Sequence, residues 1–310
     1  MTQTKRDTRV NRPMQNITLL DGGMGQELVR RSGKSPTPLW STTVMLEQPE
    51  LVSELHADFI RAGADVITVN AYTSTPTRLA RDGMGDQFET LQITACQLAM
   101  QARDRCAVEH VKITGCLPPL VASYRPDLAL STDETLAQYR RICEVQARYV
   151  DVILCETMGS IAEAWGAATA GYETGKPVWL ALSLDDNRPE YLRSGELLSE
   201  AIETLQEIPL QALLLNCSRP ETITSAWETF RSGSRVPVGA YGNGFTSIDA
   251  LQPGGTVSTL EARNDLGPDA YADMAMAWVE QGATLVGGCC EVGPSHIACL
   301  RDRLQAYKAG

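Results

Sequence analysis

Two adjacent cysteines near the end of the chain lie in a setting that suggests chemistry. Residues 283–290 form a short apolar run that leads into Gly287-Gly288-Cys289-Cys290. Glycine permits backbone conformations that other residues resist and lets a ligand or another segment come close. Adjacent cysteines do not easily bridge each other, because a disulfide needs a defined separation and torsion. The pair therefore indicates a metal site, a reactive thiol pair or a coincidence in a cysteine-rich core.

Other polar side chains follow the ends of apolar runs elsewhere in the chain. They comprise carboxylates, amides, thiols and a phenol, at Asp21, Asn70, Cys116, Glu156, Asn216, Cys217, Tyr241 and Asn243. This set is rich in thiols and poor in imidazole, because His56, His110 and His296 are expected in helices or before strands. We therefore expect neither a histidine-based zinc site nor a Ser-His-Asp triad.

The lysines and the glycine-rich stretch exclude further kinds of site. No lysine is expected at a strand end, which removes the nucleophile of a Schiff-base aldolase. The stretch Asp21-Gly22-Gly23-Met24-Gly25 lacks the spacing of a dinucleotide-binding loop, and no Walker-type loop is present.

The elements that must position these residues alternate regularly along the chain. Eight apolar runs are each followed by a segment with helical spacing or helix-start residues, and the runs cover residues 18–25, 64–72, 112–116, 151–157, 178–184, 211–218, 236–244 and 283–290. Continuous apolar runs are typical of strands covered on both faces. The pattern predicts an α/β fold, a (β/α)₈ TIM barrel in a single domain over residues 17–310, with an open doubly wound sheet as the alternative. We expect residues 32–48 to form a loop and residues 245–267 an irregular insert, which is a candidate lid.

Barrel enzymes place their chemistry at the carboxyl ends of the strands. Cys217, after the sixth run, can therefore meet Cys289 and Cys290, after the eighth, across the barrel mouth. Three thiolates would leave one position of a tetrahedral Zn²⁺ open, as in catalytic zinc sites. The alternative is that these cysteines are small buried core residues. We expect that structural role for the other six cysteines, namely Cys96, Cys106, Cys116, Cys143, Cys155 and Cys299.

Composition limits the class of protein. The net charge of −11 argues against a nucleic-acid partner, and no stretch approaches the length of a membrane-spanning helix. Nine cysteines, an odd number scattered through 310 residues, argue against a secreted disulfide framework. Residues 1–16 are polar and lack the apolar core of a signal peptide, so we expect a flexible tail on a cytoplasmic protein.

Taken together, the chain resembles the homocysteine S-methyltransferases, a family of zinc-dependent barrels. The resemblance runs from about residue 19 to residue 304 and is carried by Leu20-Asp21-Gly22-Gly23-Met24-Gly25, Glu156-Thr157, Asn216-Cys217, Gly287-Gly288-Cys289-Cys290 and Pro294-Ser295-His296-Ile297. An Asn-Cys and a Gly-Gly-Cys-Cys, in that order at strand ends, form a specific signal. The resemblance implies a (β/α)₈ barrel, in agreement with the alternation of elements.

The resemblance also implies roles for individual residues. Cys217, Cys289 and Cys290 would hold Zn²⁺, with the open position taken by the sulfur of homocysteine. Asp21 and Glu156 would bind the amino end of homocysteine, although Asp21 also suits a turn before glycines and Glu156 the start of a helix. Two amides, Asn70 and Asn216, are further candidates for substrate binding, or tie loop backbone together.

The methyl donor follows from electrostatics. A thiolate-rich site favours a donor whose methyl group is attached to a positive centre, because the transfer neutralises charge. Sulfonium and quaternary ammonium donors both meet this requirement better than a neutral amine. The donor we expect to methylate homocysteine and give methionine is a sulfonium, S-methylmethionine or S-adenosylmethionine. Trp40, Tyr72, Tyr241 and Phe245 are candidates for contact with this cation, or for packing at the rim. The insert at 245–267 departs from what we expect of betaine-dependent enzymes. This departure counts against betaine, which is kept as the alternative donor.

Two readings from other functional classes remain at this point. One is a metal-free barrel that uses Cys289 and Cys290 as a redox dithiol. The other is a non-catalytic protein that binds zinc or a thiol metabolite. Metal content separates the first from a zinc enzyme, and methyl transfer separates the second.

Overall fold

The computed structural model describes residues 16–309, so the tail expected at 1–16 lies almost wholly outside the described residues. Eight strands form one sheet in the order β1, β10, β9, β8, β5, β4, β3, β2, and all neighbouring strands run parallel. A parallel bridge between Leu20 and Val66 joins the two ends of this sheet. The (β/α)₈ barrel is thereby confirmed, and the open sheet is excluded. The barrel strands are β1 (Thr18–Leu19), β2 (Val66–Thr68), β3 (Lys112–Leu117), β4 (Val152–Met158), β5 (Val178–Leu182), β8 (Ala212–Asn216), β9 (Val238–Tyr241) and β10 (Leu285–Val286).

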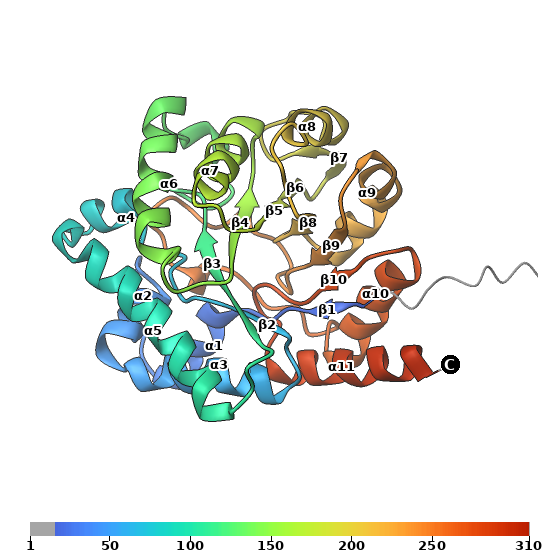
Figure 1. Cartoon of the computed structure of the whole chain (residues 1–310), viewed down its shortest axis with the longest axis horizontal. Coiled ribbons are helices and arrows are strands. Elements are labelled where there is room, and N and C mark those ends of the chain that lie inside the picture. The colour runs from blue at the N-terminus through green and yellow to red at the C-terminus, as the bar shows by residue number, and fades with distance from the viewer. Residues whose placement is uncertain (1–15, 310) are drawn as a thin grey trace, which may run out of the picture.

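Helices surround the strands on the outside of the barrel (Figure 1). The helices that follow the strands are α3 (Pro49–Arg61), α5 (Phe88–Cys106), α6 (Thr132–Gln146), α7 (Ile161–Glu173), α8 (Leu198–Leu205), α9 (Pro220–Gly233), α10 (Pro268–Glu280) and α11 (Pro294–Ala309). The loops also contain shorter helices, namely α1 (Met24–Ser32), α2 (Ser41–Glu47) and α4 (Pro76–Arg81). They contain the 3₁₀ turns η1 (Gly85–Gln87), η2 (Pro126–Leu128) and η3 (Val257–Thr259) as well. Strands β6 (Leu184–Asp185) and β7 (Arg188–Leu192) form a separate antiparallel pair.

Local sequence explains where several of these helices begin. Proline occupies the first turn of α3, α4, α9 and α10, where its missing N–H removes no helical hydrogen bond. Ser131 and Glu134 form a reciprocal capping box at the start of α6. Ser160 accepts from the backbone N–H of Glu163 and caps α7. These signals lie in the connections after the strands, and they fix where the chain turns back along the barrel.

Two apolar layers hold the barrel together. The larger lies between the strands and the helices, and the smaller fills the barrel interior. Interior members include Val152, Leu154, Trp179 and Leu214, which point inward from β4, β5 and β8. Side chains alternate across a strand, so each run supplies both layers and must be apolar on both faces. The continuous apolar runs in the sequence have this cause.

The first segment of the chain differs from expectation. We predicted a strand over 18–25 and a loop over 32–48, but β1 contains two residues, α1 begins at Met24, and α2 lies within the expected loop. Helix α2 exists because it buries Val44 and Met45 against the core. Such tertiary burial overrides weak local signals. The short helix α4 and the β6–β7 pair were likewise not predicted.

None of the helices between residues 16 and 309 combines the length and the apolar character that crossing a bilayer requires.

Candidate active site

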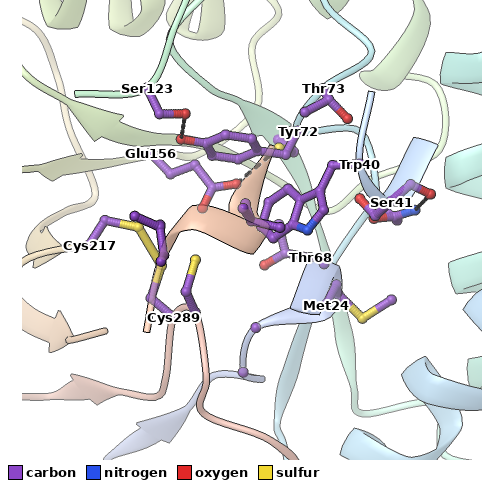
Figure 2. Close-up of a pocket in the computed structure, with 18 of the residues that line it drawn as sticks. Met24, Trp40, Ser41, Thr68, Tyr72, Thr73, Ser123, Glu156, Cys217 and Cys289 are labelled. Carbon is purple, nitrogen blue, oxygen red and sulfur yellow. Dashed lines mark hydrogen bonds between the residues drawn. A yellow bond between two sulfur atoms is a disulfide. The ribbon is translucent and has the colours of Figure 1, made fainter. Parts of the chain in front are cut away.

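A cavity opens at the carboxyl ends of the barrel strands, where the sequence predicts the chemistry. Its wall contains six of the seven predicted site residues, namely Asp21, Asn70, Glu156, Cys217, Cys289 and Cys290. Figure 2 shows residues from strand ends and connecting loops converging on this space. The seventh, Asn216, is fully buried directly before Cys217.

The three predicted metal ligands meet in this cavity. The sulfur atoms of Cys217, Cys289 and Cys290 all lie within 4.8 Å of one another. Cys217 and Cys289 are joined as a disulfide, with their Cα atoms 5.9 Å apart, and Cys290 is a free thiol. The disulfide and a metal centre are alternative states of the same sulfurs, because only thiolates bind a metal. Three convergent sulfurs suit a soft or borderline ion such as Zn²⁺, so once reduced this donor set fits the predicted cofactor.

The backbone around Cys217 is held in an unusual conformation. Its φ angle is +48°, in the left-handed region that non-glycine residues seldom adopt. The Cys217 carbonyl accepts hydrogen bonds from Arg193 Nη2 at 3.1 Å and from Ser183 Oγ at 3.4 Å. Cys289 is fixed from the other side, because its N–H donates to the Gly242 carbonyl at 2.9 Å. Strained residues persist where their surroundings determine them, often at functional sites.

The glycine-rich turn after β1 is required by close packing at the site. A Cβ atom on Gly23 would lie 2.5 Å from the carbonyl oxygen of Cys289, and a Cβ atom on Gly25 would overlap the Trp40 indole. Only glycine lets this turn approach both the cysteine loop and the aromatic ring. The close packing of the cavity wall therefore explains these two glycines.

Asp21 is a buried carboxyl group in the cavity wall. Its Oδ2 accepts the backbone N–H of Thr68 at 2.8 Å, and its Oδ1 accepts the Thr68 hydroxyl at 3.3 Å. Burial raises the pKa of Asp21 to about 8, and the nearby Glu156 contributes in the same direction. A cationic group in the cavity would relieve both effects.

Glu156 lies at the end of β4 and faces the same space. Its Oε1 accepts a hydrogen bond from the thiol of Cys116 at 2.9 Å. Burial raises the pKa of Glu156 to about 7. We expected Cys116 to be only a core residue, but it lines the cavity and orients this carboxyl group. Its place at the end of β3 was the signal that could have identified it.

The two predicted amides have structural partners. Asn70 donates from Nδ2 to the Ser41 carbonyl at 3.3 Å and lines the cavity. Asn216 accepts the Thr157 N–H at 2.9 Å and donates to the Thr157 hydroxyl at 3.1 Å. Thr157 has a φ angle of +63°, so Asn216 stabilises the strained turn that follows Glu156. Substrate binding by either amide remains a prediction.

Aromatic side chains form another part of the cavity, and we call Trp40, Tyr72, Tyr241 and Phe245 the aromatic wall. Trp40 and Tyr72 meet edge to face, with ring centroids 6.2 Å apart and an interplanar angle of 86°. The Trp40 indole N–H donates to Gln26 Oε1 at 3.0 Å, which fixes the ring. All four residues were named from the sequence, and their convergence confirms the expected placement but not a role in cation binding.

The insert at 245–267 covers part of the cavity. Its ends are drawn together by the antiparallel bridge between Phe245 and Ala262 and by the hydrogen bond from Thr246 N–H to the Glu261 carbonyl at 2.9 Å. Its middle contributes mainly apolar residues to the lining, at Leu251, Gly255, Val257 and Leu260. These side chains can exclude water from the space above the sulfurs.

Sequence reasoning missed several residues of the site besides Cys116. They lie on loops and on the short helix α4 as well as at the end of β2, and they include Thr68, Arg78, Ser123, Tyr124 and Arg193. Thr68 lies inside the strand predicted over 64–72, and it is the structure that ends this strand at Thr68. The others come together only through the course of the loops.

Comparisons with known proteins agree with this geometry. Residues 18–304 match the family model described as homocysteine S-methyltransferase. A homocysteine S-methyltransferase from Escherichia coli is 31% identical over 93% of this chain and 96% of its own length. The crystal structure of the E. coli homocysteine methyltransferase MmuM in a metallated form is 28% identical, with a TM-score of 0.79 over 94% of this chain and 97% of that one. An oxidised form of the same enzyme matches with a TM-score of 0.77.

The match spans all eight barrel strands and includes every predicted site residue. The match agrees with the barrel fold, with the cavity at the strand ends and with the cluster of three cysteine sulfurs. The chain therefore belongs to the homocysteine S-methyltransferase family and is an enzyme of the methyltransferase class.

Proposed function

We propose that this enzyme transfers a methyl group from a sulfonium donor to the sulfur of homocysteine, giving methionine, with Zn²⁺ held by Cys217, Cys289 and Cys290. The observation that carries the proposal is the convergence of three sulfurs in one cavity with two buried carboxyl groups. When bound, the zinc ion would lower the pKa of the homocysteine thiol and keep its sulfur nucleophilic at neutral pH.

The chain's own residues bind and orient the amino acid. Asp21 and Glu156 provide carboxylates for its ammonium group, since a buried carboxyl with a raised pKa gains a counterion when a cation binds. Thr68 and Cys116 hold these two carboxyls in place. Orientation of this kind supplies much of the rate of a transfer between two bound molecules.

The aromatic wall suits the donor. A sulfonium ion is attracted to aromatic faces, and the attraction strengthens when water is excluded. In the transfer, the carbon–sulfur bond of the donor breaks as the new bond to the homocysteine sulfur forms. The electron pair of the broken bond stays on the donor sulfur, which becomes a neutral thioether. The apolar side chains of the insert keep water from this space.

The test uses reduced, zinc-loaded enzyme with homocysteine and one donor at a time. S-methylmethionine carrying a deuterated methyl group should give methionine labelled in its methyl group, detected by mass spectrometry. S-adenosylmethionine and betaine are run in parallel. Activity with betaine alone would refute a sulfonium donor, and methylation that is independent of zinc would refute the metal assignment.

The disulfide between Cys217 and Cys289 is a specific observation in favour of the alternative function, a metal-free redox protein. A redox protein should carry no stoichiometric metal after reduction and should cycle between dithiol and disulfide with a dithiol substrate. A methyltransferase should take up about one zinc ion per chain on reduction and lose methyl transfer on oxidation. Metal analysis of the reduced protein separates these outcomes.

A further inference from the structure

Arg78 is a buried cation that the reaction described so far does not use. Its side chain leaves helix α4, is 7% exposed and lines the cavity. No carboxylate within residues 16–309 is in ion-pair contact with it. A buried guanidinium without a counterion is costly to keep, so an anion that enters the cavity would be favoured there.

Its surroundings hold the guanidinium in one position. Nη2 donates to the Pro119 carbonyl at 2.9 Å and to Ser123 Oγ at 3.4 Å, while the buried Nε has no hydrogen-bond partner among the described residues. The guanidinium carbon lies 5.4 Å from the centre of the Tyr72 ring. The Tyr72 hydroxyl in turn contacts Ser123 Oγ at 3.0 Å, as Figure 2 shows. The group is thus pre-oriented, with donors to spare for a carboxylate.

The two carboxyl groups of the cavity wall have hydrogen-bond partners other than Arg78. Asp21 accepts hydrogen bonds from Thr68, and Glu156 accepts one from Cys116. Glu163 is the acid that does act on Arg78, but its Oε1 accepts the Leu120 N–H at 3.2 Å, outside the cavity lining. The guanidinium lies over Tyr72, in the aromatic wall assigned to the donor, and Glu156 also acts on the pKa of Tyr72.

We propose that Arg78 binds the carboxylate of the methyl donor and selects sulfonium donors that are amino acids. This assignment rests on the proposed function. It places the donor's positive sulfur near Tyr72 and Trp40 and its negative carboxylate at the guanidinium stacked on Tyr72. The donor is then held at two points of opposite charge, and its orientation toward the homocysteine sulfur is fixed.

The test compares two donors that differ only in the carboxylate. S-methylmethionine and its carboxamide are offered with homocysteine to the zinc-loaded wild type, Arg78→Met and Arg78→Lys, with Arg140→Met as a surface control. Arg140 lies on α6, is 52% exposed by its side chain and pairs with Glu173 on the outside of the barrel. Arg78→Met should raise KM for S-methylmethionine on the order of 100-fold, the scale for losing a buried charged contact.

The remaining kinetic constants distinguish a donor-binding role of Arg78 from a structural role and from a role in binding homocysteine. With the carboxamide, kcat/KM should be the same for Arg78→Met and the wild type, and Arg78→Lys should recover part of the affinity for S-methylmethionine. An equal loss with both donors would mean that Arg78 only supports the fold. A rise in KM for homocysteine with both donors would assign Arg78 to the acceptor. Either result overturns the proposal.

Calorimetry keeps the proposal separate from the proposed function. If the wild type fails to methylate homocysteine with every donor tested, the proposed function fails. Binding of S-methylmethionine and of its carboxamide is then compared directly in wild type and Arg78→Met. A carboxylate preference in the wild type that disappears in the variant supports Arg78 as the anchor, and equal or undetectable binding refutes it. If circular dichroism shows that Arg78→Met is unfolded, Arg78→Lys carries the same comparison.

Discussion

Replacing Asp21 by asparagine should stabilise the free protein near neutral pH and weaken ligand binding at the same time. In the folded protein, burial raises the pKa of Asp21 from 3.8 to about 8. The folded state therefore keeps a proton that the unfolded state loses, and stability falls as pH rises from about 4 to about 8. Asparagine has no proton to lose, so Asp21→Asn removes this part of the pH dependence.

The magnitude follows from the two pKa values. A pH of 7 is about 3 units above the pKa of 3.8 in the unfolded chain, so the unfolded carboxyl is ionised. The folded carboxyl, with a pKa of about 8, is still mostly protonated at this pH. At 1.36 kcal/mol per unit, the free energy of unfolding contributed by Asp21 should fall by roughly 4 kcal/mol between pH 4 and pH 7. Asparagine can still accept the Thr68 N–H, and its amide can donate to the Thr68 hydroxyl, so the local hydrogen bonds survive.

The assay is urea denaturation of reduced, metal-free protein at several pH values between 4 and 8. The difference in free energy of unfolding between wild type and variant removes the pH dependence of all other groups. Asp127→Asn is the matched control, because Asp127 is exposed and its pKa is lowered by Arg125, so its effect has the opposite sign and is small. In parallel, binding of L-norleucine, which has the ammonium group but no thiol, is measured by calorimetry.

Norleucine affinity should rise with pH in the wild type, because the ammonium group prefers an ionised Asp21. In Asp21→Asn the affinity should fall on the order of 10- to 100-fold, the scale of a hydrogen bond to a charged group. A variant that loses stability equally at every pH would show that Asp21 is only a turn residue. Unchanged norleucine affinity would remove Asp21 from the binding site.

Three further predictions concern the rest of the cavity. Cys290→Ser should lower zinc content in the reduced protein to well below one ion per chain by mass spectrometry, whereas full zinc content would remove Cys290 from the ligand set. Trp40→Leu should raise KM for the sulfonium donor about 5- to 30-fold with little change in KM for homocysteine, and equal changes in both would contradict a donor-side role. Cys116→Ala should raise KM for homocysteine by about 10-fold, the scale of one lost hydrogen bond, and Cys116→Ser should restore it, so equal effects of the two substitutions would show that only packing matters.

Much of the fold could be predicted because each barrel unit carries its own local signals. Prolines at helix starts, the Ser131 capping box and apolar runs of strand length are short-range features. The prediction failed in the first connection, where α1 and α2 replace an expected strand end and loop. Both helices depend on contacts with distant parts of the chain. Helices α1 and α2 pack on each other and on α3, and α2 also packs on α5.

The sequence alone determined the alternation of elements, and through it that Asp21, Glu156, Cys217, Cys289 and Cys290 share one end of the barrel. Parallel strands closed into a barrel bring their carboxyl ends to one face, so the order of the residues was enough. Only the tertiary structure decided which groups meet there: that Cys217 bridges Cys289, that Cys116 contacts Glu156, and that Arg78 is buried with its Nε unpaired among the described residues. Pairings between side chains depend on loop course, rotamer and burial, and these arise from packing across the whole barrel.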